Sequence, residues 1–198
     1  MVMSGLRRLA DVLGDGGGEN AAPIPWDTAR AEVGFDFPAD YREFVERYGS
    51  VEFNSEFYTV IPTDGSPRRD WPTGFAGFTE FTVRNIGERM RWSRIHDKWN
   101  PCPYPVYPEA GGLLAWAKND ESDHIFWIME GDDPDAWPQA VWFRQLDRWE
   151  RFEGGMTDFL VAALDGTFPR GDELGIAPYP GKAFSWRRIG GYWEGSTG

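Results

Sequence analysis

The stretch FPADYREFVERYG, residues Phe37–Gly49, decides the fold that we expect for this chain. Pro38 suits the first turn of a helix, because its missing N–H group would have no partner there. Apolar side chains then recur at spacings of three and four residues, on one face of the helix: Tyr41, Phe44, Val45 and Tyr48. Gly49 can adopt the left-handed conformation that ends a helix. The stretch therefore predicts a helix that buries one stripe in a core.

Upstream of this stretch we expect one shorter helix and a flexible segment. Apolar residues recur at helical spacing directly before it: Trp26, Ala29 and Val33. Residues 1–13 suit a short helix, but the Gly-rich residues 15–22 that follow are typical of a linker. We therefore assign residues 1–22 to a flexible N-terminal segment and linker, and residues 23–166 to one domain.

Downstream, the sequence predicts strands and a closing helix. Several segments have the length and the aromatic or β-branched content of strands: residues 51–53, 57–61, 113–118, 124–130, 140–145 and 148–152. Both alternating sets of side chains in residues 124–130 are apolar, so we expect that strand to be covered on both faces. A helical stripe follows at residues 156–164. Residues 167–198 form a Gly- and Pro-rich C-terminal extension that wraps loosely over the domain.

These segments together predict helices followed by strands, with an antiparallel meander in the second half. We expect the C-terminal helix to pack on one face of that sheet. Residues 62–108, where Pro and Gly are scattered among aromatic residues, predict a long covering loop with a helix at residues 83–92. Residues 101–108 predict an extended edge of polyproline type.

The charge of the chain argues against a nucleic-acid partner. There are 32 Asp and Glu residues against 20 Lys and Arg residues, which gives a formal net charge of -12. Nucleic-acid binders instead cluster Lys and Arg against the phosphates. The most basic run, residues 84–98, carries Glu88 and Asp97 among its cations, so we interpret it as a solvated face.

The sequence also indicates a cytoplasmic protein. Cys102 is the one cysteine, so no disulfide within the chain requires an oxidising compartment. Arg7 and Arg8 lack the apolar run of an export signal after them. No stretch approaches the roughly 18 apolar residues of a membrane span. We expect no membrane contact, and the sequence leaves the oligomeric state open.

No pattern in the sequence indicates catalysis, a cofactor or a metal. His96, His124 and Cys102 do not have the spacing of zinc ligands. His124 begins an apolar strand, where a half-buried histidine is more typical than a general base. The acids of residues 132–135 lack the glycine and the closing glutamate of a calcium loop, and no phosphate-binding glycine motif occurs.

Four motifs follow one another along residues 23–165: FPADYREFVERYG, then GGLLAWAKNDESDHIFWI, GDDPDAWP and WERFEGGMTDFLVAAL. This ordered set resembles the SUKH superfamily, most closely its Smi/Knr-like branch as found in actinobacteria. Ser122 departs from the pattern, because these proteins often have Gly at that place in the hairpin turn. The resemblance implies an α+β fold, with N-terminal helices packed on a central antiparallel-rich sheet, a meander in its second half and a C-terminal helix. It implies a binding module without shared catalytic residues. It also implies a role as an immunity protein that neutralises a polymorphic or contact-dependent toxin, often a nuclease, or as a regulatory adaptor.

Acidic residues are the candidate contacts with a protein partner, such as a toxin domain. From Glu109 to Asp135 there are eight acids against Lys118 alone, and such a surface complements a basic cleft. The strand 124–130 places them at two ends roughly 20 Å apart, at about 3.3 Å per residue. The first candidate cluster is Asp120, Glu121, Asp123 and Asp147; the second is Asp132, Asp133, Asp135 and Trp137.

Two readings stay open at this point. Trp137 is either an aromatic anchor at the rim of an interface or packing against the edge of the sheet. The 11 Trp and 7 Tyr residues and the many acids also suit a carbohydrate-binding or glycan-cleaving protein, which would use paired carboxylates. We prefer the non-catalytic protein-binding module.

Overall fold

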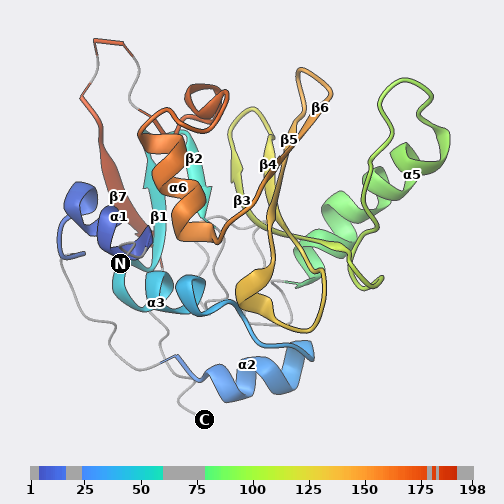
Figure 1. The fold of residues 1–198 in the computed structure, drawn as a ribbon, viewed down its shortest axis with the longest axis horizontal. Helices are drawn as coiled ribbons and strands as arrows, with labels where there is room; N and C mark the ends of the chain where they lie inside the picture. The colour runs from blue at the N-terminus through green and yellow to red at the C-terminus, as the bar shows by residue number, and fades with distance from the viewer. Residues whose placement is uncertain (1–4, 17–23, 60–78, 178–179, 182, 191–198) are drawn as a thin grey trace.

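A computed structural model of the chain describes residues 5–16, 24–59, 79–177, 180–181 and 183–190. Its strands form one seven-stranded sheet in the order β6-β5-β4-β3-β2-β1-β7 (Figure 1). Every neighbouring pair is antiparallel. The strands are β1 (Ser50–Phe53), β2 (Phe57–Thr59), β3 (Leu113–Asn119), β4 (His124–Ile128), β5 (Gln139–Phe143), β6 (Arg148–Phe152) and β7 (Trp186–Gly190). The expected meander is β3 to β6.

Helices cover this sheet, and the predicted α+β class is confirmed. The helices are α1 (Gly5–Leu13), α2 (Trp26–Val33), α3 (Ala39–Tyr48), α5 (Glu88–His96) and α6 (Met156–Leu164). A π-helical turn, Phe81–Gly87, runs directly into α5, so the helix predicted at residues 83–92 is present and longer. Helices α1, α3 and α6 pack against one another, and α5 lies far from α1 (Figure 1). No helix among the described residues has the length and apolarity that crossing a membrane requires.

Helix α3 forms as the sequence predicts. Its four stripe residues are all buried, from Tyr41 to Tyr48. Gly49 has a φ of 70° and donates its N–H to the Val45 carbonyl, which closes the helix. The stripe faces the sheet, because the Tyr41 ring meets the Trp127 ring of β4 edge to face, with centroids 4.9 Å apart.

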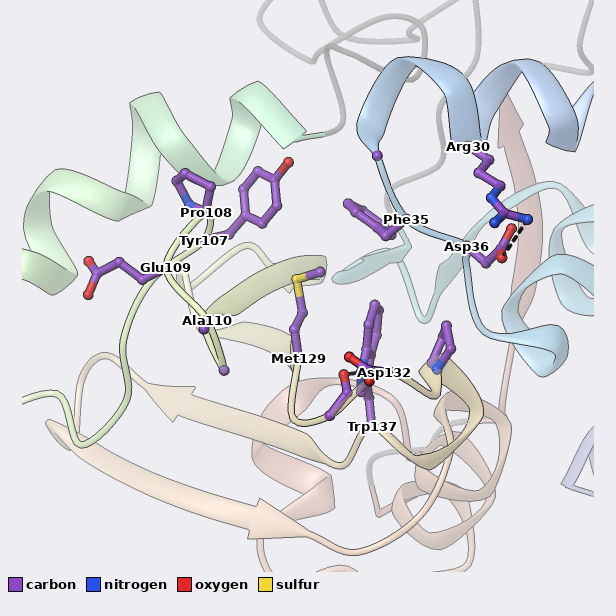
Figure 2. A pocket seen from close by; sticks show the side chains of 14 residues that line it. Arg30, Phe35, Asp36, Tyr107, Pro108, Glu109, Ala110, Met129, Asp132 and Trp137 are labelled. Carbon is purple, nitrogen blue, oxygen red and sulfur yellow. Dashed lines mark hydrogen bonds and ion pairs between the residues drawn. The ribbon is translucent and has the colours of Figure 1, made fainter.

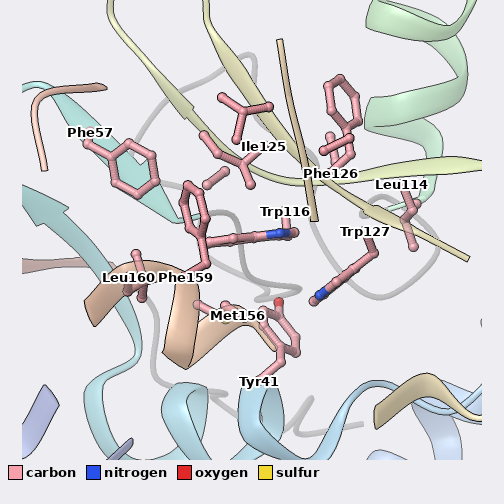
Figure 3. Packing of buried hydrophobic residues seen from close by; sticks show 14 of the residues in the cluster. Tyr41, Phe57, Leu114, Trp116, Ile125, Phe126, Trp127, Met156, Phe159 and Leu160 are labelled. Carbon is pink, nitrogen blue, oxygen red and sulfur yellow. The ribbon is translucent and has the colours of Figure 1, made fainter. Parts of the chain in front are cut away.

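An aromatic layer fills the space between the sheet and helices α3 and α6 (Figure 3). Trp116 contacts Trp127 and the Phe159 ring of α6, with centroids 6.2 and 6.0 Å apart. The Trp116 indole N–H donates to Gln139 Oε1 at 2.7 Å, and Gln139 donates to the Trp137 and Gly154 carbonyls at 3.2 and 3.1 Å. This buried amide therefore gives the indole a partner, which a purely apolar core would lack.

Strand β4 is covered on both faces, as expected. All of its residues are buried. Trp127 points to helix α3, while Phe126 and His124 lie on the other face with Trp149 and Trp142. On that second face, the Arg89 guanidinium of α5 lies 4.7 Å from the Trp142 ring centroid. Helix α5 thus covers the sheet opposite to α3 and α6.

The structure corrects the expectation for both ends of the chain. Residues 5–13 form helix α1, as the sequence suggested, but Leu9 and Leu13 are buried against the core, so this helix belongs to the packed domain and not to a flexible segment before it. Residues 168–176 bury three further apolar side chains, and β7 completes the sheet beside β1. The sequence missed β7 because its partner lies more than 130 residues away, and pairing at that distance leaves no local pattern.

Arg188 of β7 binds the C-terminal end of helix α3. Its Nε donates to the Tyr48 carbonyl at 2.7 Å, and its Nη2 donates to the Arg47 carbonyl at 2.9 Å. These carbonyls have no partner inside the helix, and the negative end of the helix dipole favours a cation there. Desolvation by burial lowers the pKa of this guanidinium, yet its usual value is so high that it stays charged.

We expect Arg188→Ala to lower the free energy of unfolding by about 1–3 kcal/mol, because carbonyls at the end of α3 lose a charged donor. Chemical denaturation followed by tryptophan fluorescence measures the change. Arg7→Ala, on the exposed side of α1, is the control and should unfold like the parent protein. Equal midpoints for the Arg188 variant and the control would contradict this role.

Candidate functional site

The first predicted acidic cluster lies where two hairpin turns meet. The turn between β3 and β4 contacts the turn between β5 and β6, because the Arg144 N–H donates to Asp123 Oδ1 at 2.7 Å. Gln145 Nε2 also donates to Glu121 Oε2 at 3.4 Å. Ser122 has a φ of 65°, the left-handed region that usually favours glycine. The structure therefore brings residues 120–123 and Asp147 to one end of the sheet.

Asp123 is a structural residue of this turn, which corrects its assignment as a surface contact. It is only 5% exposed, and it accepts hydrogen bonds from Asn119 Nδ2 and the Arg144 N–H. Burial raises the pKa of its carboxyl group, although these hydrogen bonds oppose the shift. Asp120 accepts a bond from the Tyr58 hydroxyl at 3.1 Å. Asp120, Glu121 and Asp147 are exposed.

Two acids of the second predicted cluster hold the ends of helices. Asp133 precedes the 3₁₀ turn Pro134–Ala136 and accepts the Asp135 N–H at 3.1 Å. Asp135 in turn accepts the Ala39 N–H at 2.6 Å, at the N-terminus of helix α3. Carboxylates at helix N-termini satisfy orphan N–H groups and the positive end of the dipole. Asp132 is exposed and makes no such bond within the described residues.

A third carboxylate continues this arrangement. Asp40, in the first turn of α3, accepts the N–H and the hydroxyl of Thr157 at 2.9 and 3.1 Å, where helix α6 begins. Gly155 is required beside it, because a Cβ there would lie 2.6 Å from Asp40 Oδ2. Burial is the main cause that raises the pKa of Asp40. We call Asp133, Asp135 and Asp40 the capping acids.

Trp137 is core packing, so its reading as an anchor at the rim is wrong. The residue is 4% exposed, its ring centroid lies 5.9 Å from that of Phe35, and its indole N–H donates to the Gly131 carbonyl at 3.4 Å. The Trp137 side chain nevertheless lines a hollow in the surface.

That hollow is a groove of about 380 Å³ between three segments of the chain (Figure 2). The segments are residues 30–36, 107–111 and 129–137. Tyr107 and Pro108 lie on one side, and Phe35 and Trp137 on the other (Figure 2). The groove also gathers three carboxylates from three segments: Asp36, Glu109 and Asp132. Of the residues that line this groove, the sequence analysis had proposed only Asp132 and Trp137 as partner contacts.

An apolar surface lies beside the first cluster. Trp92 and Ile95 of α5 are 61% and 73% exposed, and Trp99, just after the helix, is 96% exposed. Asn100 Nδ2 donates to the Asp147 carbonyl, which ties this segment to the turn between β5 and β6. We call Trp92, Ile95 and Trp99 the α5 ridge. Trp92 and Ile95 are three residues apart on α5, whereas Trp99 follows the end of the helix, so helical spacing could have signalled only part of the ridge.

His124 and Cys102, the two side chains most suited to catalysis outside these surfaces, are buried. His124 is buried, which lowers its pKa to about 4, and its Nδ1 donates to the Ser122 carbonyl at 2.8 Å. Burial also raises the pKa of the Cys102 thiol. Within the described part of the chain, no three His, Cys, Asp or Glu side chains are grouped so that they could hold a metal ion.

Comparisons with known proteins identify no relative of this chain. No protein-family model matches the chain, and no curated protein and no solved structure is similar to it. The resemblance to the SUKH superfamily therefore stays a prediction from the motifs.

We expect Asp135→Ala to lower the free energy of unfolding by about 0.5–2 kcal/mol, because the N-terminus of α3 loses its cap. Asp132→Ala, three residues earlier and exposed, is the matched control and should change it by less than about 0.5 kcal/mol. Urea denaturation of both variants measures the difference. Equal losses would show that the acids of this segment do not differ in role.

His124 predicts an acid-labile fold. Its folded pKa of about 4 lies below its ordinary value of 6.5, so the unfolded chain takes up a proton in this window and the folded chain does not. Stability should therefore fall as the pH drops from 6.5 to 4, by up to about 3 kcal/mol. His124→Phe should flatten this dependence in denaturation curves measured across that range, whereas His96→Phe, at an exposed position, should keep it. Parallel curves for the parent protein and the His124 variant would contradict the prediction.

Proposed function

We propose that the chain is a non-catalytic protein-binding module and that the α5 ridge makes the contact. The observation that carries this proposal is the exposure of Trp99, 96%, next to exposed Ile95 and Trp92. Large apolar side chains that are exposed within one short segment are typical of interaction sites. Tryptophan is also the residue type most enriched among the side chains that dominate the energy of interfaces.

The ridge is held ready for a partner. The Asp97 carboxylate accepts the N–H groups of Trp99 and Asn100 at 2.9 and 3.1 Å, which fixes the turn, and these bonds lower the pKa of Asp97. A preformed surface loses less conformational entropy on binding than a mobile one.

Charged and apolar side chains around the ridge complete the pattern of an interface. Leu146 of the neighbouring turn is 48% exposed, and Glu121, Asp147 and Arg144 are exposed around it. Protein interfaces have an apolar centre and a polar rim. The first acidic cluster, without Asp123, therefore supplies the rim rather than the whole site.

Within this class we propose an immunity protein of the cytoplasm, or a related regulatory adaptor. The motifs that resemble the SUKH superfamily support this choice. The net charge of -12 supports it as well, because acidic surfaces accelerate the encounter with a basic partner such as a nuclease toxin domain.

A carbohydrate-binding protein is the second candidate, because exposed indole rings such as those of Trp92 and Trp99 also stack on sugars. Glycan cleavage has less support. It requires an acid that stays protonated near the substrate, and the described carboxyls with a raised pKa are Asp40 and Asp123. Both are occupied by backbone N–H groups in turns and helix ends.

The test starts from the genes beside the gene of this chain: a small C-terminal toxin domain encoded there is co-expressed with the chain, and the lack of any such domain counts against the immunity role. The parent protein should restore growth and bind the domain in calorimetry. Trp92→Ala and Trp99→Ala should each raise the dissociation constant about 30-fold or more, since a central tryptophan contributes about 2 kcal/mol or more, and the double variant should bind more weakly still. Val12→Ala, at an exposed apolar position of α1, is the control. Unchanged binding by the double variant, or binding of a glycan array that the double variant loses, would overturn the proposal.

A further inference from the structure

We propose that the groove between residues 30–36, 107–111 and 129–137 binds the guanidinium group of an arginine side chain presented by a protein partner. The groove lies at the end of β4 opposite to the turns that flank the α5 ridge. The proposal is therefore a second binding site, and it does not depend on the function proposed for the ridge.

The carboxylates of the groove supply the charge for this ligand. Asp132 is exposed, makes no ion pair with a described residue and is not used as a cap. Asp36 is partly exposed on the opposite segment. Glu109 is already neutralised, because Arg91 and Arg94 lie 3.6 and 3.0 Å from its oxygens. Asp132 and Asp36 are therefore the acids that an incoming cation can pair with, Asp36 by exchanging its one described partner, Arg30, for the ligand.

Aromatic rings supply the second half of the recognition. Phe35 is half-buried between two other rings, with its centroid 5.9 Å from those of Tyr107 and Trp137. The Tyr107 hydroxyl donates to the Val33 carbonyl at 3.3 Å, which holds its ring against the end of α2. A guanidinium is planar, stacks on aromatic faces and pairs with carboxylates through parallel hydrogen bonds, whereas an ammonium group lacks the flat shape.

The structure already contains a guanidinium at the rim of this groove. Arg30 Nη1 lies 3.3 Å from Asp36 Oδ2 (Figure 2). The side chains of Arg30 and Asp36 are 66% and 46% exposed, so the pair is a weak surface contact that solvent screens. A partner's arginine can therefore displace Arg30 at small cost. The Arg30–Asp36 pair shows that this groove accepts a guanidinium at its rim. Arg30 would also compete with a partner's arginine for Asp36.

The experiment is an NMR titration of the full chain with N-acetyl-arginine methylamide, following the indole N–H of Trp137. We expect a saturable shift with a dissociation constant in the millimolar range. The matched probe is the citrulline analogue, which has nearly the same shape and no charge, and it should give no saturable shift.

The dissociation constants of three variants for the arginine probe show which residues bind it. Asp36→Asn with Asp132→Asn should raise the dissociation constant about tenfold or more, because two charged acceptors are lost. Arg30→Ala should lower it, because the internal competitor is gone. Asp27→Asn, on the exposed side of α2 outside the groove, should leave it unchanged. Equal shifts with the citrulline analogue, or a dissociation constant that the double variant does not change, would overturn the proposal. An undisturbed spectrum in each variant shows that the fold is intact.

Discussion

The contact between Trp127 and Tyr41 is the interaction on which the arrangement of the molecule depends. Both side chains are fully buried, and their rings meet at 90° with centroids 4.9 Å apart. One belongs to the covered strand β4 and the other to the stripe of α3, so this contact fixes the helix on the sheet. The position of α3 then sets where the preceding segment, with Phe35 and Asp36, meets the loop around Trp137.

The capping acids explain why charge alone is a poor guide to the acids that a partner could contact. Asp135 and Asp40 hold the N-termini of α3 and α6 across 96 and 117 residues of sequence. A count of acids cannot separate such carboxylates from solvent-exposed ones, because their partners are backbone groups that come close only in the folded chain. Asp133 is different, since an aspartate directly before a proline is a local signal for a helix start. That signal could have removed it from the candidate site.

The sequence predicted those elements whose apolar pattern can be recognised within a single segment of the chain. The stripe of α3, the meander β3 to β6 and helix α6 all show periodic apolar residues, and all are present. Strand β7 has the sequence WRRIG, in which two arginines break the alternation of a typical strand. Those arginines pair with Glu52 and with the end of α3, so their role is readable only once β1 and α3 are in place. The groove was equally hidden, because its walls come from three separate segments.

The net negative charge of the chain affects how the exposed α5 ridge can associate with other molecules. Three large exposed apolar residues on one short segment would favour self-association in a neutral protein. A net charge of -12 opposes that association, because copies of the chain repel one another, while a basic partner is attracted to the same field. In the proposed function, selectivity follows from charge at long range, whereas affinity follows from apolar burial at contact. On this reading the acids need not gather in one patch, and their spread over the turns, the groove and the helix ends is consistent with binding.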